Sequence, residues 1–272
     1  MRTATTDTEP TRASADDTAL YFLLAISIST VALLPAVLAR LGVLPGPVEP
    51  YMAGAPIAVF SPTIAAVVAS RVENRRDGVR ALFRQLRSWP ANPVWYVLAL
   101  TLPGLVFAVG RAVYALVPGN DGGPWLYLPT EPQHVAAMLI VPVGEEIGWR
   151  GYALPRLQRR YGAAKAAVVL GLLWALWHVP MFIATGTTAT ALLILWPYFV
   201  GGSVMFAWFY NRTGGSLPLA ILLHAGAHLD APGRGGSGDP TPLVIMALAL
   251  LALAPVLIFG DRLGRDRRIA AE

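Results

Sequence analysis

Long apolar runs without charges, separated by short charged segments, constrain this chain more than any other feature. A bilayer-spanning helix needs about 20 apolar residues. The candidate runs lie at 18–42, 52–70, 93–117, 133–152, 166–186, 189–210, 216–229 and 243–260, and the run at 216–229 is short. Because the runs are continuous rather than alternating, helices are expected rather than a β-barrel. The predicted fold is therefore an all-α, polytopic membrane bundle of about eight transmembrane helices.

Composition agrees with this prediction and limits the number of domains. The chain has 272 residues, of which 55% are hydrophobic and 14% charged, whereas soluble domains carry about 25% charged residues. We expect one transmembrane domain at 18–260, with cytoplasmic tails at 1–17 and, strongly basic, at 261–272. The polar start of mixed charge favours a retained first span over a secretory signal peptide.

The arginines predict the orientation. Segments 71–92 and 153–165 and the tail 261–272 are rich in Arg and Lys, whereas the segments between them carry Asp and Glu. The positive-inside rule is satisfied in every loop if both termini are cytoplasmic (N-in, C-in). The net charge of +5 is explained in this way, and no nucleic-acid partner is expected. With no cysteine in the chain, disulfides and sulfur-based metal sites are excluded.

Two segments between spans have a predicted character of their own. Within 75–89, Val79, Leu82, Phe83 and Leu86 share one helical face opposite arginines, as in a helix lying on the cytoplasmic interface; a plain basic loop is the alternative. Segment 230–242 is a flexible loop by its Gly and Pro content.

Ionisable residues inside spans are costly and usually functional, and three neighbouring spans carry a set of them. The fourth span contains Glu145, Glu146 and Arg150, and the fifth contains His178. The seventh contains His224 and His228. These six residues are the candidate catalytic residues.

Helix geometry suggests a role for each. Glu146 and Arg150 are four residues apart and can form an ion pair. Glu145 projects about 100° away, so its carboxylate is freer and can act as a general base that deprotonates water. His224 and His228 share a face, and together with His178 they can polarise a carbonyl, stabilise an oxyanion or bind a metal ion.

Structural roles are the alternative for several of these residues. The Glu146–Arg150 pair can serve to fix helix packing, and His228 lies near the end of a short span, where it can be interfacial. Trp149, Trp174 and Trp177 are interpreted mainly as packing residues and interface anchors. Gly171, Gly201, Gly202 and Gly226 are expected to allow close helix approach.

At these residues the sequence resembles the CPBP intramembrane proteases, also called the CAAX-protease or bacteriocin-processing family. Its pattern has a Glu-Glu-x-x-x-Arg motif, an aromatic-x-x-x-His motif and a His-x-x-x-Asn motif. The chain matches them in order over 133–230, with Glu145, Glu146 and Arg150, then Trp174 with His178, then His224. Trp174 stands where phenylalanine is more usual, and His228 stands in place of the asparagine.

The resemblance implies an eight-helix membrane fold and an endopeptidase in which the first glutamate activates water and the histidines assist. The implied substrate is a peptide or a membrane-anchored protein, and the implied location is the bacterial plasma membrane. Both metal-dependent and metal-independent mechanisms fit the family. Three imidazoles, at His178, His224 and His228, make Zn²⁺ a candidate cofactor here.

Two alternatives to a protease remain open: a proton- or ion-coupled transporter, and a non-catalytic membrane scaffold or immunity protein of the same fold. Transporters often show paired repeats, and none is visible in this sequence. One discrepancy concerns depth. The span limits place Glu145 toward the cytoplasmic end and His178 and His228 toward the outer end, several ångströms apart at about 1.5 Å per residue.

Overall fold

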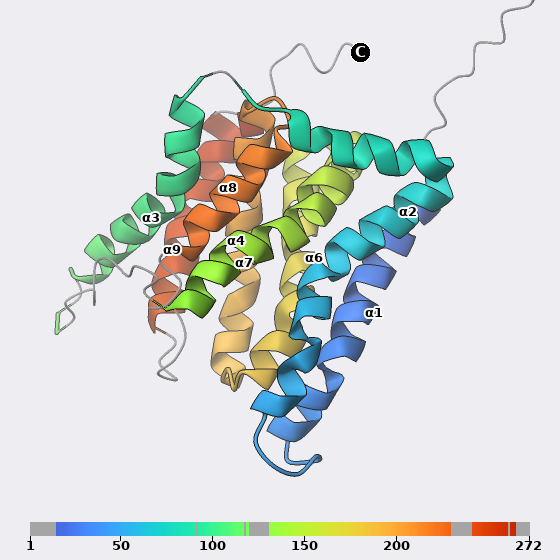
Figure 1. The fold of residues 1–272 in the computed structure, drawn as a ribbon. Helices are drawn as coiled ribbons and strands as arrows, with labels where there is room; N and C mark the ends of the chain where they lie inside the picture. The colour runs from blue at the N-terminus through green and yellow to red at the C-terminus, as the bar shows by residue number, and fades with distance from the viewer. Residues whose placement is uncertain are drawn as a thin grey trace, which may run out of the picture.

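The described chain is a bundle of helices, drawn in Figure 1. A computed structural model describes residues 15–90, 92–116, 118–119, 131–229, 241–260 and 262–264, and within these ranges no strand occurs. The helices are α1 (Ala15–Arg40), α2 (Ala55–Arg84), α3 (Val94–Tyr114), α4 (Pro132–Gly148), α5 (Leu154–Tyr161), α6 (Ala163–Ala184), α7 (Ala189–Arg212), α8 (Leu217–His228) and α9 (Thr241–Pro255). Short 3-10 turns form at Glu49–Gly54, Gln85–Arg87 and Arg262–Gly264, and π turns at Trp149–Ala153 and Val256–Gly260. The all-α prediction is confirmed.

Five segments are long and apolar enough to cross a bilayer. They are Asp17–Arg40, Glu49–Arg87, Val94–Tyr114, Ala163–Ala184 and Ala189–Arg212, and each contains or overlaps a predicted span. The remaining three predicted spans correspond to shorter helices. Of these, α4 has 17 residues and runs on through a π turn into α5, α8 has 12 residues, and α9 has 15. The chain is thus a multi-pass integral membrane protein, and the number eight stays a prediction.

The second predicted span continues well past its expected end. After Ser70, α2 proceeds to a bend at Asn74 and Arg75, whose backbone angles are not helical. The part after the bend lies across one end of the bundle, at the top in Figure 1. Its Leu82 is buried, whereas Arg76, Arg80, Arg84 and Arg87 are exposed. The helical alternative for 75–89 is therefore confirmed as far as Arg87, and the basic-loop alternative is wrong.

Helix packing buries the C-terminal end of α4 in the bundle, where Gly144 to Gly148 are all buried. α4 contacts both α2 and α8, and it crosses the bundle at a slant in Figure 1. Gly144 and Gly148 lie four residues apart on the face toward α2, where a Cβ on Gly148 would stand 2.5 Å from the backbone of Pro62. The Thr63 hydroxyl donates to the Gly144 carbonyl at 2.7 Å. Such small residues let two helices approach closely.

The glycines expected to allow close approach divide into two groups. At three of them an added Cβ would come too close to a neighbouring helix. The distance would be 2.6 Å from Gly171 to α7, 2.7 Å from Gly201 to α9 and 2.4 Å from Gly226 to α3. Gly202 has its nearest neighbour at 3.9 Å, which is ordinary contact. Gly226 falls between His224 and His228, so close packing on α3 holds this part of α8 in place.

Two predicted segments lie largely outside the described residues. The loop expected at 230–242 is described only at Thr241 and Pro242, which begin α9. The tails are described only at 15–17, which start α1, and at 262–264. The cytoplasmic position of both termini stays a prediction.

Candidate active site

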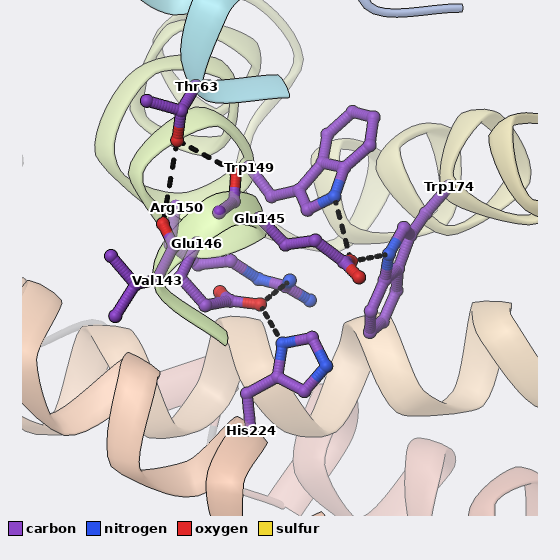
Figure 2. A network of polar contacts seen from close by, with 9 residues as sticks. Thr63, Val143, Glu145, Glu146, Trp149, Arg150, Trp174 and His224 are labelled. Atoms are coloured by element: carbon purple, nitrogen blue, oxygen red, sulfur yellow. Dashed lines mark hydrogen bonds and ion pairs between the residues drawn. The ribbon is translucent and has the colours of Figure 1, made fainter. Parts of the chain in front are cut away.

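Glu145 lies at the end of α4 with its carboxylate held by two indole groups. The side chain is 2% exposed. Its Oε2 accepts hydrogen bonds from Trp174 Nε1 at 2.9 Å and from Trp149 Nε1 at 3.3 Å, as Figure 2 shows. Trp149 reaches it from one turn further along the same helix, and Trp174 from α6. Two N–H donors on one oxygen stabilise a carboxylate that water cannot fully solvate.

Glu146 points away from Glu145 into a separate ionic cluster. Its Oε1 accepts hydrogen bonds from Arg150 Nη1 and from His224 Nδ1, each at 2.8 Å. The Glu146 and Arg150 side chains are both fully buried. The predicted ion pair is therefore present, and it extends across the bundle to α8.

Arg150 is also held by two aromatic rings. Its guanidinium carbon lies 4.5 Å from the Trp174 ring centroid and 4.3 Å from the Phe206 ring centroid. These distances are within the range of cation–π attraction. Arg150 thereby ties the π turn at Trp149–Ala153 to α6 and α7, while Glu146 ties the same segment to α8.

His178 is oriented by its own helix. Its Nδ1 lies 2.9 Å from the Trp174 carbonyl oxygen. Because a carbonyl oxygen only accepts, Nδ1 carries the hydrogen, and Nε2 of the neutral ring carries a lone pair. The ring stacks on Phe199 with centroids 4.2 Å apart. The tautomer and the plane of this imidazole are thus both fixed.

His224 and His228 form a stacked pair. Their ring centroids are 5.1 Å apart and the ring planes differ by 10°, as expected for residues four apart on one helix face. Because Glu146 accepts from Nδ1 of His224, that nitrogen is the donor in the bond. His228 is half-buried beside it.

A cavity of about 500 Å³ connects these groups. Glu145, His178, His224 and His228 all line it, together with aromatic side chains of α6 and α7. Glu146 and Arg150 lie behind this lining, in the buried cluster. The six candidate residues therefore divide into four that face the cavity and two that hold α4 in place.

The depth discrepancy is resolved by the packing of the helices. Since α4 lies at a slant, Glu145 reaches the level of α6 at which Trp174 donates to it. The cavity then joins Glu145 to His178, one turn further along α6. Distances along separate helices cannot be compared without their tilts, which the sequence does not provide.

The contact of two tryptophans with Glu145 is the functional feature that the sequence interpretation missed. Trp149, Trp174 and Trp177 are buried, with 0%, 6% and 5% exposure, so their interpretation as packing residues is confirmed and their interpretation as interface anchors is wrong. Trp149 and Trp174 donate hydrogen bonds to the Glu145 carboxylate. Within the described ranges this carboxylate forms no ion pair. Trp177 instead donates to the Ser61 hydroxyl at 2.8 Å. The four-residue spacing from Glu145 to Trp149 was a usable signal.

The three histidines do not form a metal-binding set in this arrangement. Across the described segments, no three His, Asp or Glu side chains come close enough together to hold a metal ion. The Nδ1 hydrogen bonds of His178 and His224 to a carbonyl and a carboxylate are of the kind that metal-bound imidazoles also make, so it is the separation of the side chains that distinguishes this arrangement from a zinc site. The residues present therefore do not fit the zinc site that the sequence suggested.

Comparisons with known proteins bear on this same segment. A family model described as type II CAAX prenyl endopeptidase Rce1-like matches residues 123–229, which contain all six candidate residues. A curated protein from Methanococcus maripaludis, CAAX prenyl protease 2, is 28% identical over 139 residues, which is 47% of this chain and 51% of the relative. Over residues 123–229 the chain is similar to this family of CAAX prenyl endopeptidases. The resemblance to the CPBP family seen in the three motifs is confirmed, and the chain spans about half the length of the curated relative it matches.

Proposed function

We propose that this chain is an intramembrane endopeptidase that hydrolyses a peptide bond of a peptide or a membrane-anchored protein. One observation carries the proposal: a buried glutamate, free of any ion pair in the described structure, lines one cavity with three histidines. The family match to residues 123–229 supports the reaction class. A lipid bilayer, expected to be a bacterial plasma membrane, is the proposed setting.

In the proposed reaction, Glu145 acts as the general base. Its carboxylate takes a proton from a water molecule, and the oxygen of that water forms a bond to the scissile carbonyl carbon. The proton then passes to the amide nitrogen as the C–N bond breaks, which leaves a carboxylate and an amine. The indoles of Trp149 and Trp174 hold Oε2 in place, so that the other carboxylate oxygen is the one positioned for proton transfer.

The histidines assist at the carbonyl oxygen. A tetrahedral intermediate places negative charge on that oxygen, and nearby N–H donors stabilise it. His178, His224 and His228 face the cavity from two helices. Because the Nδ1 hydrogens of His178 and His224 are already used, these two rings donate through Nε2 in their protonated, imidazolium form, and this is the proposed oxyanion contact. Glu146 and Arg150 are positioning residues, since they fix the end of α4 and orient His224.

The transporter and scaffold alternatives gain no support from the comparisons. The tail beyond 230 and the start before 133 carry none of the three motifs. In the single proposed catalytic domain, the catalytic residues therefore all lie in 133–230, and the remaining helices pack around them.

The test compares wild-type protein with Glu145→Gln in detergent, using a library of peptides and membrane-anchored substrates. The substitution keeps an oxygen that accepts from the indoles but removes the base, so cleavage is expected to fall by about 10²–10⁴-fold. Glu131→Gln is the matched control, because Glu131 is exposed at the start of the same helix.

Each result has a clear meaning. Cleavage by the wild type and the control, lost in Glu145→Gln, supports the glutamate-dependent peptidase. A folded wild type that cleaves nothing, or a Glu145→Gln protein that cleaves normally, contradicts it. Zinc content and sensitivity to a chelator, measured in the same preparation, decide whether the protein needs a metal.

A further inference from the structure

The two ends of the bundle differ in charge. Exposed arginines gather where α2 bends over the bundle and on α5, which leads into α6; they are Arg76, Arg80, Arg84, Arg87, Arg159 and Arg160. The α6–α7 turn lies at the opposite end, at the bottom in Figure 1. By the positive-inside rule, the arginine-rich end is cytoplasmic and the α6–α7 turn is extracytoplasmic.

The cavity extends from Glu145 toward the α6–α7 turn. On α1, α6 and α8, every lining residue lies in the half of the helix nearer that turn. The turn itself contributes Thr185, Gly186, Thr187 and Thr188, and three of these four are exposed. The cavity therefore reaches the surface at this end.

The path from Glu145 to the arginine-rich end is filled with side chains. Trp149, Tyr152 and Tyr21 are all 0% exposed. The Tyr21 ring stacks on Tyr152 with centroids 5.0 Å apart and meets Trp149 edge-on at 5.8 Å. The buried Glu146–Arg150 pair lies at the same level of α4. A polypeptide has no route through this layer.

We infer that the cavity is reached from the extracytoplasmic side, and that the substrate is an extended polypeptide segment already carried across the membrane. A tail presented in the cytoplasm, prenylated or not, would meet the closed end. The nature of the substrate rests on the proposed peptidase function, whereas the side of access does not.

Single introduced cysteines test the side of access, because the chain has no cysteine of its own. Thr187→Cys places a thiol at the mouth and Ala227→Cys places one on the cavity wall. Arg80→Cys marks the other end, where the native side chain is 75% exposed. Spheroplasts are treated with a small membrane-impermeant thiol reagent before and after permeabilisation.

We expect Thr187→Cys and Ala227→Cys to react in intact spheroplasts, and Arg80→Cys to react at least tenfold more after permeabilisation. Reaction of Arg80→Cys in intact spheroplasts, or of Thr187→Cys only after permeabilisation, would overturn the inference. If Thr187→Cys reacts but Ala227→Cys does not, the claim that the cavity is open from the α6–α7 turn to the active site would be overturned.

A second readout connects access with cleavage. In detergent, a bulky maleimide on Thr187→Cys is expected to reduce peptide cleavage at least tenfold relative to the unlabelled variant, and the same label on Arg80→Cys to change it less than twofold. Equal inhibition by both labels contradicts access at the α6–α7 turn. Absence of cleavage before labelling refutes the peptidase, while the labelling pattern still decides the side of access.

Discussion

Glu146 accepts hydrogen bonds through a single oxygen from both Arg150 and His224, at 2.8 Å in each case. One carboxylate thus joins a cation on its own helix to an imidazole 78 residues away in sequence. The arrangement makes Nδ1 of His224 the donor. The orientation of the His224 ring is therefore set by Glu146 on α4. The geometry of α8 near the cavity therefore depends on a residue that does not face the cavity.

Replacing Glu146 with Gln should destabilise the fold. A buried guanidinium would lose its anion, and removing one partner of a buried pair costs about 3–5 kcal/mol. We expect a lower thermal unfolding midpoint in detergent. The double variant Glu146→Gln/Arg150→Met should recover much of this stability without recovering cleavage. A double variant no more stable than Glu146→Gln alone would contradict the ion-pair explanation.

Trp174→Phe should weaken catalysis while retaining an aromatic ring. It removes the 2.9 Å hydrogen bond to Glu145, and a hydrogen bond to a charged group contributes about 1.5–3 kcal/mol. If that energy acts in the transition state, kcat/KM falls by about 10–100-fold, measured with a peptide cleaved by the wild type. Trp177→Phe is the comparison, since it loses a bond to Ser61 instead and should lose less activity. Equal losses in the two variants count against a specific role for the Trp174 indole.

His228→Asn should be tolerated far better than His228→Ala. The ring of His228 lines the cavity beside His224, and an asparagine amide keeps an N–H donor at this position. Removing one oxyanion donor costs about 10²–10³ in kcat, so we expect that loss for His228→Ala and less than about tenfold for His228→Asn. Rate measurements on the two variants decide the matter. If Asn is as harmful as Ala, the imidazole itself is required, as it would be for a metal ligand.

Gly148→Ala should disturb the packing of α4 on α2. The added methyl would meet the Pro62 backbone at 2.5 Å, and overpacking of this kind costs about 1–3 kcal/mol. Gly104→Ala is the matched control on α3, because nothing lies within 4 Å of a Cβ placed there. We expect a lower unfolding midpoint for Gly148→Ala only. An unchanged midpoint would show that α2 and α4 can move apart without loss of stability.

Local spacing predicted a good part of this arrangement. The Glu146–Arg150 pair and the His224–His228 stack follow from residues four apart on one helix, which the sequence displays directly. The long apolar runs likewise predicted the helices. None of these features depends on how one helix lies against another.

Contacts between helices could not be predicted in the same way. The bond from Glu146 to His224 and the bond from Trp174 to Glu145 depend on the slant of α4 and on the glycines that let it approach α2. The bend at Asn74 and Arg75 has no Pro or Gly at these two positions; the nearby signal is Gly78, where a Cβ would lie 2.2 Å from the Ser70 carbonyl oxygen across the bend. The orientations of the His178 and His224 rings are likewise set by hydrogen bonds to the Trp174 carbonyl and to Glu146, and the second of these crosses between helices.

The π turn at Trp149–Ala153 has a consequence for how this sequence can change over time. The Gly151 carbonyl in this turn accepts from the Gln85 side chain at 3.0 Å. A π turn contains an additional residue relative to an α turn, so deleting one residue here would convert it to an ordinary α turn and rotate the side chains within it, while the helix beyond keeps its orientation. Arg150 would leave its place between Trp174 and Phe206, and Gly151 would turn away from Gln85. The contacts of Arg150 and Gly151 both depend on the additional residue, so the length of this stretch should be preserved among working relatives.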